Sequence, residues 1–504
     1  MQDRYYSSKE FKTLLSRYEA ATNNGDTIFM DSDELTDIAE YYYSNGHTDQ
    51  ALATIDYALS IFPNATAPLV FKARFALIND GNTKQARAYL DRVTDQTDLD
   101  YIYLCAEILF HEGKTDEAHN YLREMYERID DDTDRADYVL DVATIYADYG
   151  MPDKAKEWLA LSDETDLADY KELEGRIAIS QGLYEKSEHI FNQLLDEDPY
   201  STPYWNHLAS SQIHLGHISD SIASSEYSIA INPNDEEAIL NKANGLYALT
   251  NYDEALRYYQ RFTQLCPDED TGYLLQALTQ LNLGHYEEAV TLLKQAEQKA
   301  TSGSSASSNL LEIYQELAIT LSHLNRLDEA LAYIDKAEQL GEANPNILIV
   351  VRGHLMLQHG KTEEAYNQFK KAIRQSASAP EVYLHIAISL YDCGYLVLAS
   401  QLLQLLLSSP PHPDWSEGYA YLAACYKELG QHELYLHYLK KACEKNPEEA
   451  RIVFFDDFQP ELPPKEYYNY QVKKTITPTE NPTTSPNLPQ GEEPAPSLSG
   501  RDGE

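Results

Sequence analysis

Residues 251–270 read NYDEALRYYQRFTQLCPDED. This stretch predicts a turn and then an amphipathic helix with the small Ala255 and the bulky Tyr259, which Pro267 ends. The same order of residues recurs along the chain at a spacing of mostly about 34 residues, which is the length of a helix pair. The position of the small residue in the second helix falls at Ala51, Ala86, Ala118, Ala155, Ser187, Ser221, Ala255, Ala289, Ala330, Ala365, Ala399 and, with a large residue, at Tyr435.

Residues that end helices stand before and after each predicted second helix. Glycine or asparagine stands five positions before the small residue, where a first helix would end in a left-handed cap. These positions are Gly46, Gly81, Gly113, Gly150, Gly182, Gly216, Gly284, Gly360, Gly394 and Gly430, with Asn325 once. Proline follows the second helix at Pro63, Pro199, Pro233, Pro267, Pro411 and Pro447. The sequence therefore predicts a series of helix pairs.

Small residues also recur inside the first helices. They stand at Ala39, Ala106, Ala143, Gly175, Ala209, Ala243, Ala277, Ala318, Gly353, Ala387 and Ala423. Small residues at matched points on two helices allow the backbones to approach closely, while bulky residues fill the space above and below.

One unit, YWNHLASSQIHLGHISDSIASSEYSIAINPND at 204–235, shows which family the pattern resembles. Trp205, Leu208, Ala209, Gly216 and Pro233 stand where tetratricopeptide repeats have an aromatic residue, Leu, a small residue, Gly and Pro. It departs from the family at Ser221 and Ser225, where Ala and an aromatic residue are usual. The resemblance implies an all-α solenoid, a right-handed superhelix of antiparallel helix pairs, with about twelve units over 31–447.

The remaining segments flank or interrupt this array. Residues 1–30 are expected to form an N-terminal capping helix, and TSGSSASS at 301–308 a loop insertion. The segment 448–470 contains Phe454, Phe455 and Phe458, which either cap the last repeat or recruit a partner. Residues 471–504 are expected to be disordered, because they contain too few apolar residues to form a core.

Composition argues against several classes of function. The 39 Lys and Arg residues stand against 82 Asp and Glu, a net charge of −43, which would repel nucleic acid and anionic membranes. The chain has no long apolar run, and its five cysteines lie far apart without metal-ligand spacing. No catalytic or cofactor-binding motif is present. We therefore expect a cytoplasmic protein that is not an enzyme and holds no metal or cofactor.

The resemblance also implies a binding site, because the family binds proteins along a concave groove lined by the first helices. The residues that this implies are Glu40, Tyr43, Phe71, Phe75, Tyr103, Glu107, Phe110, Glu172, Asn206, Asn244 and Tyr247. Chaperone-binding members clamp a C-terminal carboxylate with basic residues, but here Arg176 is nearly alone and Asn244 lacks a basic companion. We expect no such clamp.

An acidic, aromatic groove suits a basic or amphipathic segment of a protein or peptide. Residues 1–200 contain 42 acidic and 18 basic residues, so attraction of such a segment would be strongest there. The alternative is that the acidity only keeps the array soluble. The predicted function is a non-catalytic scaffold or adaptor. A second hypothesis is a regulatory or assembly subunit of an enzyme encoded elsewhere, which docks through the C-terminal end. A third is an enzyme with an unfamiliar site on the solenoid, whose signature would be perturbed carboxylates in a closed pocket.

Overall fold

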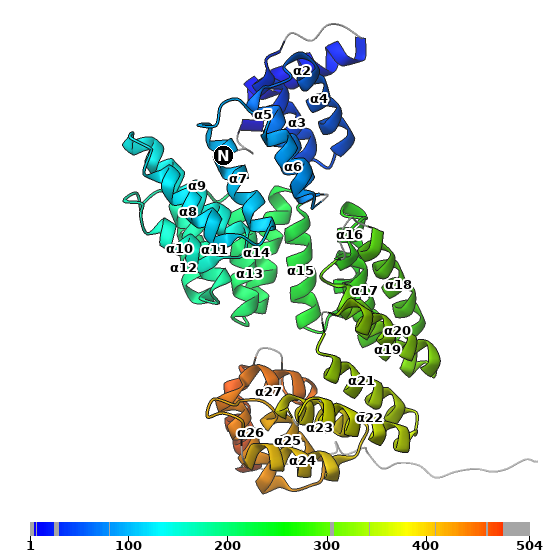
Figure 1. Cartoon of the computed structure of the whole chain (residues 1–504). Coiled ribbons are helices and arrows are strands. Elements are labelled where there is room, and N and C mark those ends of the chain that lie inside the picture. The colour runs from blue at the N-terminus through cyan, green and yellow to red at the C-terminus, as the bar shows by residue number, and fades with distance from the viewer. Residues whose placement is uncertain are drawn as a thin grey trace, which may run out of the picture. The chain divides into compact units, whose positions relative to one another are not determined.

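The computed structural model describes residues 5–6, 8–24, 30–79, 81–302, 307–341, 343–377, 379–408, 410–459 and 462–476. Within these ranges every regular element is a helix, which confirms the predicted all-α fold (Figure 1). The chain divides into two compact units, Met1–Ser389 and Leu390–Glu504. Among the described residues, no helix is both long and apolar enough to cross a membrane.

The first unit is a series of consecutive helices that pack in pairs. They are α2 (Lys9–Asn24), α3 (Ser32–Ser44), α4 (Thr48–Ile61), α5 (Thr66–Ile78), α6 (Thr83–Leu90), α7 (Leu99–His111), α8 (Thr115–Tyr126), α9 (Asp132–Asp148), α10 (Pro152–Leu159), α11 (Ala168–Ser180), α12 (Tyr184–Glu197), α13 (Thr202–His214), α14 (Ile218–Ile231), α15 (Glu236–Ala248), α16 (Tyr252–Leu265), α17 (Asp270–Asn282), α18 (Tyr286–Ser302), α19 (Leu310–His323), α20 (Leu327–Leu340), α21 (Pro345–Gln358), α22 (Thr362–Gln375) and α23 (Pro380–Asp392), in which the unit boundary lies.

Left-handed residues end the first helices, as the sequence predicts. Gly46 has φ 76° and its N–H donates to Tyr43 O at 3.0 Å, while the N–H of His47 donates to Tyr42 O at 2.8 Å. These two bonds satisfy carbonyls at the helix end and turn the chain into the second helix. Asn325 takes the same conformation with φ 58°, and so does Thr250 with φ 61°, although its branched side chain disfavours it.

The pair α13 and α14 has a polar seam where the family usually places apolar residues. Ser221 Oγ donates to Ala209 O at 2.8 Å, and Ser224 Oγ donates to Gln212 Oε1 at 2.8 Å. Ser225 is fully buried and donates to Ser221 O. Hydroxyl groups that bond backbone and amide oxygens replace the usual bulky side chain, which explains the departure at Ser221 and Ser225.

Helix α2 covers the start of the array. Its Phe11, Leu14 and Tyr18 are buried in one cluster with Leu35 and Ile55 of the first pair. An end unit would otherwise expose this apolar surface to water.

The segment expected to be a loop insertion differs at its edges from the prediction. Helix α18 continues through Ser302, and residues 303–306 lie outside the described residues. After them, Ser307 Oγ donates to Asp270 Oδ2 at 2.7 Å and Asn309 Nδ2 donates to Thr271 Oγ1 at 3.1 Å, which attaches the chain to the start of α17.

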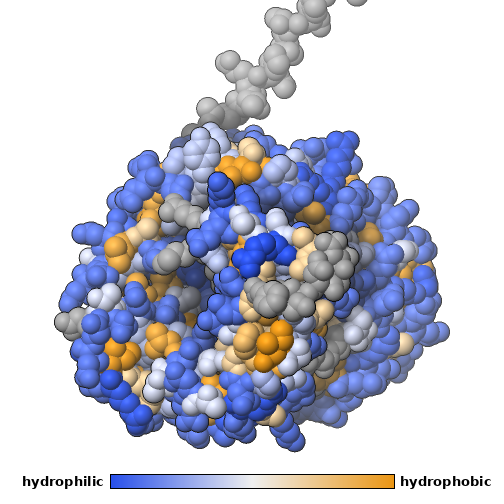
Figure 2. All heavy atoms as spheres, turned by 90° about the horizontal axis from the view of Figure 1, so that it is seen from above, coloured by the Kyte–Doolittle hydropathy of each residue, from blue (hydrophilic) through white to orange (hydrophobic). Residues whose placement is uncertain are grey.

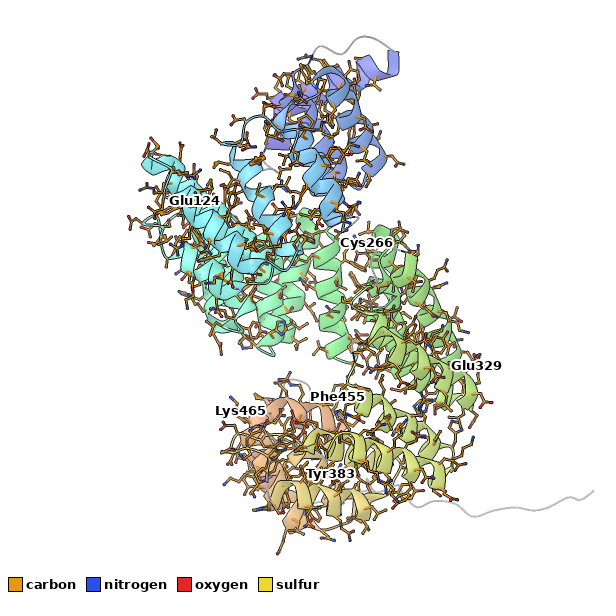
Figure 3. The ribbon with its side chains drawn as sticks, in the orientation of Figure 1. Glu124, Cys266, Glu329, Tyr383, Phe455 and Lys465 are labelled. Carbon is orange, nitrogen blue, oxygen red and sulfur yellow. The ribbon has the colours of Figure 1, made fainter. Side chains whose placement is uncertain are left out.

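The second unit contains α24 (Leu396–Ser408), α25 (Tyr419–Glu428), α26 (His432–Lys445), α27 (Pro447–Val453), η1 (Phe455–Asp457), η2 (Pro464–Glu466) and α28 (Tyr467–Ile476). Phe454 and Phe458 are buried, and Phe458 stacks on Tyr467 with ring centroids 3.8 Å apart. Phe455, which is labelled in Figure 3, remains 39% exposed. Two of the three phenylalanines are therefore used inside the unit, as the capping alternative expects.

Residues 471–476 are helical where the sequence predicts disorder. They belong to α28, which packs on α26 and begins at the buried Tyr467. A neighbouring helix thus supplies the apolar surface that this polar segment lacks by itself. The rest of the predicted disordered tail, 477–504, lies outside the described residues.

Candidate functional site

The first helices of successive pairs contact one another in the first unit. Helix α3 contacts α5, α5 contacts α7, and the contacts continue through α9, α11 and α13 to α15. We call the surface that these seven helices share the first-helix face. All of the residues that the sequence predicts for binding lie on six of them, α3, α5, α7, α11, α13 and α15.

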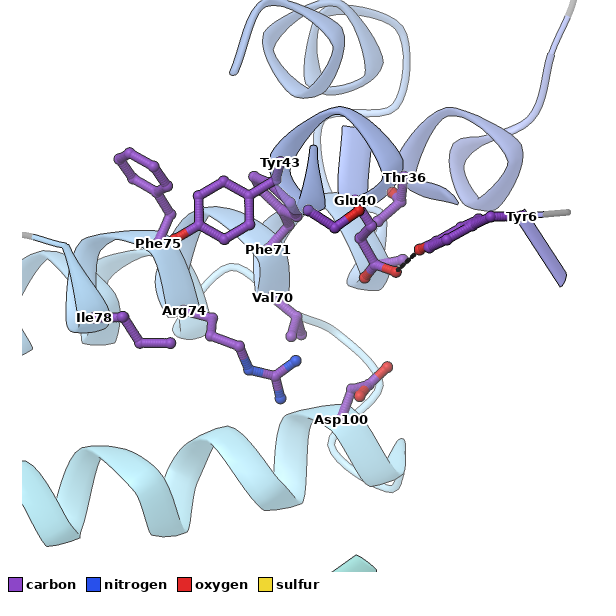
Figure 4. A pocket seen from close by; sticks show the side chains of 12 residues that line it. Tyr6, Thr36, Glu40, Tyr43, Val70, Phe71, Arg74, Phe75, Ile78 and Asp100 are labelled. Carbon is purple, nitrogen blue, oxygen red and sulfur yellow. Dashed lines mark hydrogen bonds between the residues drawn. The ribbon is translucent and has the colours of Figure 1, made fainter. Parts of the chain in front are cut away.

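A cavity of about 220 Å³ opens on this face between α3, α5 and the start of α7, and we call it the N-terminal pocket (Figure 4). It brings together four predicted residues, Glu40, Tyr43, Phe71 and Phe75. Its other lining residues are Tyr6, Thr36, Ser44, Ala67, Val70, Arg74, Ile78 and Asp100.

Aromatic rings hold one wall of the N-terminal pocket in place. Tyr43 meets the rings of Phe71 and Phe75 edge to face, with centroids 5.9 Å apart in both cases. Asn79 Nδ2 donates to Tyr43 Oη at 2.9 Å, which fixes the tyrosine ring from the other end. The wall is therefore ordered before any ligand arrives, which lowers the entropic cost of binding.

Carboxylates line the pocket toward Tyr6. Tyr6 Oη donates to Glu40 Oε2 at 3.4 Å (Figure 4). Burial, and then the nearby Asp37, raise the pKa of Glu40. Burial likewise raises the pKa of Asp100. Both carboxylates are thus held in a setting that disfavours their charge, and a bound cation would relieve this cost.

Arg74 is the single cation among the residues that line the N-terminal pocket. Its Nη2 donates to Glu107 Oε1 at 3.1 Å, and Tyr149 Oη donates to Glu107 Oε2 at 3.4 Å. Burial of the guanidinium opposes its charge, but Glu107 and Asp100 raise the pKa of Arg74 above its ordinary value. Arg74 is therefore committed to a carboxylate of this chain.

Sequence reasoning missed Arg74, although a signal for it exists. Ala73 is the fully buried small residue of α5, and it is not among the small residues that the repeat pattern assigns to the first helices. Arg74 directly follows Ala73, just as Glu40 follows Ala39 and Glu107 follows Ala106 in their own helices. Asp100 and Tyr6 do not hold positions in the repeat that correspond to those of the predicted binding residues, so only the structure brings them to the pocket.

Three of the predicted binding residues are buried and bond to neighbouring helices. Tyr103 Oη donates to Asp141 Oδ2 at 2.8 Å, and Asn206 Nδ2 donates to Asp235 Oδ1 at 3.0 Å. Glu107 is 6% exposed and bonds Arg74, as described. These side chains join one first helix to the next and offer little surface to a ligand.

A second cavity, of about 440 Å³, lies between α9 and α11, and we call it the acidic pocket. It contains the predicted Glu172 together with Asp137, Asp141 and Asp169, and one cation, Arg176. Arg176, on α11, is paired with Asp148 of α9. Burial raises the pKa of Glu172 and of Asp141.

The remaining predicted residues are not part of either pocket. Phe110 packs against Tyr146 and Tyr149, with ring centroids 5.3 and 5.1 Å away. Asn244 Oδ1 accepts a bond from Tyr259 Oη at 2.8 Å, and Tyr247 Oη accepts one from Asn282 Nδ2 at 2.7 Å. In the ranges that the structure describes, no three His, Cys, Asp or Glu side chains are grouped as metal ligands would be.

Comparison with known proteins adds the following similarities. Residues 240–306 and 311–343 match models of the tetratricopeptide repeat. A segment of 171 residues, 33% of this chain, is 25% identical to Protein O-mannosyl-transferase TMTC1 of Homo sapiens, and the match spans only 19% of that relative. The crystal structure of the APC/C hetero-tetramer Cut9-Hcn1 is 14% identical, with 90% of this chain and 94% of that chain covered at a TM-score of 0.35. The crystal structure of MamA is 17% identical, with 33% and 94% covered at a TM-score of 0.30.

Proposed function

We propose that this chain, a tetratricopeptide repeat protein, is a non-catalytic scaffold or adaptor that binds a basic or amphipathic segment of a partner protein along its first-helix face. The observation that carries the proposal is the N-terminal pocket. There an ordered aromatic wall from α3 and α5 faces the carboxylates of Glu40 and Asp100. Aromatic residues in a pocket are typical anchors of protein interfaces, and carboxylates attract a basic partner from a distance.

The charges of the first-helix face support a basic partner rather than an acidic one. Arg74 is paired with Glu107 and Arg176 with Asp148, so neither guanidinium is free to clamp a C-terminal carboxylate. The acidic pocket adds Asp137, Asp141, Asp169 and Glu172 further along the same face. Nucleic acid is an unsuitable ligand for such a surface, because its phosphates would be repelled.

The competing explanation is that acidic residues serve solubility alone. On the face seen in Figure 2, hydrophilic residues predominate and hydrophobic residues form small scattered patches. Solubility requires charge anywhere on the surface, whereas binding requires it at the pockets. The two explanations are therefore separated by comparing charge reversal at the pockets of the first-helix face with charge reversal on the second helices.

The test uses the full chain and a set of fluorescent 15-residue peptides of basic, amphipathic, neutral and acidic composition. Binding is measured by anisotropy at low and moderate salt. We expect basic peptides to bind, salt to weaken the binding, and Glu40→Lys combined with Glu172→Lys to abolish it. The control variant combines Glu117→Lys and Glu185→Lys, two exposed positions on the second helices α8 and α12 that change the net charge equally. Equal loss in both variants, or no binding of basic peptides, would contradict the proposal.

The five cysteines, all unpaired, suit a reducing compartment, and we include a cytoplasmic location in the proposal.

One observation favours the second hypothesis, in which the C-terminal end docks onto an enzyme. Helix α24 has no charged residue, and it exposes Val397, Leu398 and Leu405 at 55, 52 and 68%. An uncharged, apolar helix surface is unusual in a chain with a net charge of −43, and such surfaces often meet other proteins. If Leu398→Lys combined with Leu405→Lys removes partner binding while basic peptides still bind, this docking function is favoured.

A further inference from the structure

We propose that the N-terminal pocket is the subsite for one arginine side chain of the partner segment, an inference that rests on the proposed function of the first-helix face. The pocket differs from the rest of that face in combining aromatic rings with carboxylates from two separate helices, α3 and α7. Each of its features points to a ligand group that is cationic, flat and carried on an apolar stem.

The charge balance of the pocket calls for a cation. Glu40 accepts a bond from the Tyr6 hydroxyl, and no ion pair within the described residues joins Glu40 or Asp100 to a basic side chain. Arg74 acts on Glu40 and Asp100 only at longer range, because its Nη2 lies 3.1 Å from Glu107 Oε1, so one resident cation faces three carboxylates. The charged residues that line the pocket, Glu40, Asp100 and Arg74, give a net charge of −1 when both carboxylates are ionised. Glu107, which lies outside the lining and bonds Arg74, brings the charge of the cluster to −2. A ligand cation would be attracted to this excess and would offset the cost of keeping the Glu40 carboxylate half-buried.

The walls of the pocket suit a ligand side chain that has an apolar stem and a flat head group. Val70 and Ala67 line the cavity beside Phe71, and Ile78 lies at its edge with 58% of its surface exposed. The three methylenes of arginine would pack on such a surface, while its planar guanidinium stacks on an aromatic ring. Its five N–H donors form a fork that reaches two carboxylates at once, and it is less strongly hydrated than the ammonium group of lysine. Arginine therefore fits Glu40 and Asp100 better than lysine does.

The size of the cavity limits the ligand to one side chain. Its volume of about 220 Å³ lies below the roughly 300 Å³ at which sites for small molecules and cofactors begin. A single arginine inserted from a segment lying along the first-helix face would be an anchor residue, around which the remaining contacts add complementarity.

The experiment replaces, one at a time, each arginine of a bound basic peptide with citrulline, which keeps the shape and removes the charge. A parallel set carries lysine at the same positions. We expect citrulline at one position to weaken binding to the full chain at least tenfold, and lysine there to weaken it severalfold. In the Glu40→Gln and Asp100→Asn variants, the loss of affinity caused by citrulline at that position should shrink to about twofold or less. The control variant Glu117→Gln should show the full loss.

Outcomes separate this inference from the function on which it rests. If basic peptides bind and every citrulline is tolerated, or if the penalty vanishes in Glu172→Gln and persists in Glu40→Gln, the arginine subsite is overturned and the scaffold function survives. Equal affinity for lysine at the sensitive position overturns the choice of arginine. N-acetyl-arginine amide alone, measured by ligand-observed NMR, provides a direct probe: its binding to the parent chain and loss in Glu40→Gln support the subsite even where no peptide binds.

Discussion

Gly175→Ala is expected to destabilise the protein, although alanine is the better helix former. Gly175 lies in the middle of α11 and faces Phe191 of α12. A Cβ atom at this position would lie 2.7 Å from Phe191 Cε2 and 2.8 Å from its Cζ, whereas ordinary contacts span 3.4–4 Å. The ring would have to retreat by about 0.7 Å, the difference between 3.4 and 2.7 Å, and Phe191 is fully buried.

The magnitude follows from two opposing effects. Replacing glycine by alanine inside a helix stabilises by about 1 kcal/mol, while overpacking a buried site costs about 1–3 kcal/mol. We therefore expect a net loss of about 1 kcal/mol. In a chain that carries Phe191→Leu, the effect of Gly175→Ala on stability should change sign. In two other repeats, where the first helix has Ala106 or Ala143, the position of Phe191 is occupied by Leu122 or Leu159. With that change present, Gly175→Ala should stabilise by up to about 1 kcal/mol.

The assay is a double-mutant cycle over Gly175→Ala and Phe191→Leu. A long repeat array need not unfold in one step, so urea unfolding is combined with hydrogen exchange of the amides in α11 and α12. The expected coupling energy is about 1–3 kcal/mol. Gly353 faces Phe369 at 2.6 Å in the same way and provides a second, independent cycle. Stabilisation by Gly175→Ala both with and without Phe191→Leu would refute the packing argument.

Three further predictions concern a turn, an ion pair and the pH dependence of binding. Thr250→Gly should raise stability by about 1 kcal/mol, seen as a higher midpoint of urea unfolding, because a branched residue at φ 61° is strained; Thr250→Ala should gain less. Arg74→Met should cost about 1–3 kcal/mol, since it leaves the buried Glu107 carboxylate without the guanidinium donor, and adding Glu107→Gln should recover at least half of that loss in the same assay. Affinity for basic peptides should fall as the pH is lowered, and the fall should begin above the ordinary pKa of glutamate, 4.5. The reason is that burial raises the pKa of Glu40 and Glu172, so that they take up protons and lose their charge at a higher pH than an exposed glutamate. Peptide titrations across this range test it, and an affinity that stays constant down to pH 4.5 would contradict it.

The candidate site could be predicted only in part. The structure groups the predicted Glu40, Tyr43, Phe71 and Phe75 around one cavity. In α5, however, the residues that are equivalent to Thr36 and Glu40 are Val70 and Arg74, so Phe71 and Phe75 were each assigned one residue away from the repeat position. The repeat phase also selected Glu107 and Asn206, yet both are buried against neighbouring helices. A repeat phase gives the direction of a side chain from its own helix, but not how closely the next helix approaches it.

The C-terminal segment shows the same limit. Composition predicted disorder from residue 471, whereas α28 continues to Ile476 because it packs on α26 and begins at Tyr467, which stacks on Phe458. Stability that comes from a distant surface leaves no local signal in the sequence.

The sequence by itself determined where helices end and which positions are small, because these properties depend on local backbone preferences. Gly46 shows this with its left-handed turn, and Ala39 with its place in the packed interior. Only the tertiary structure decided which charges are paired and which remain available. Arg74 hydrogen-bonds Glu107, and among the described residues neither Glu40 nor Asp100 forms an ion pair with a basic side chain, because the distances between α3, α5 and α7 depend on the packing of whole helix pairs.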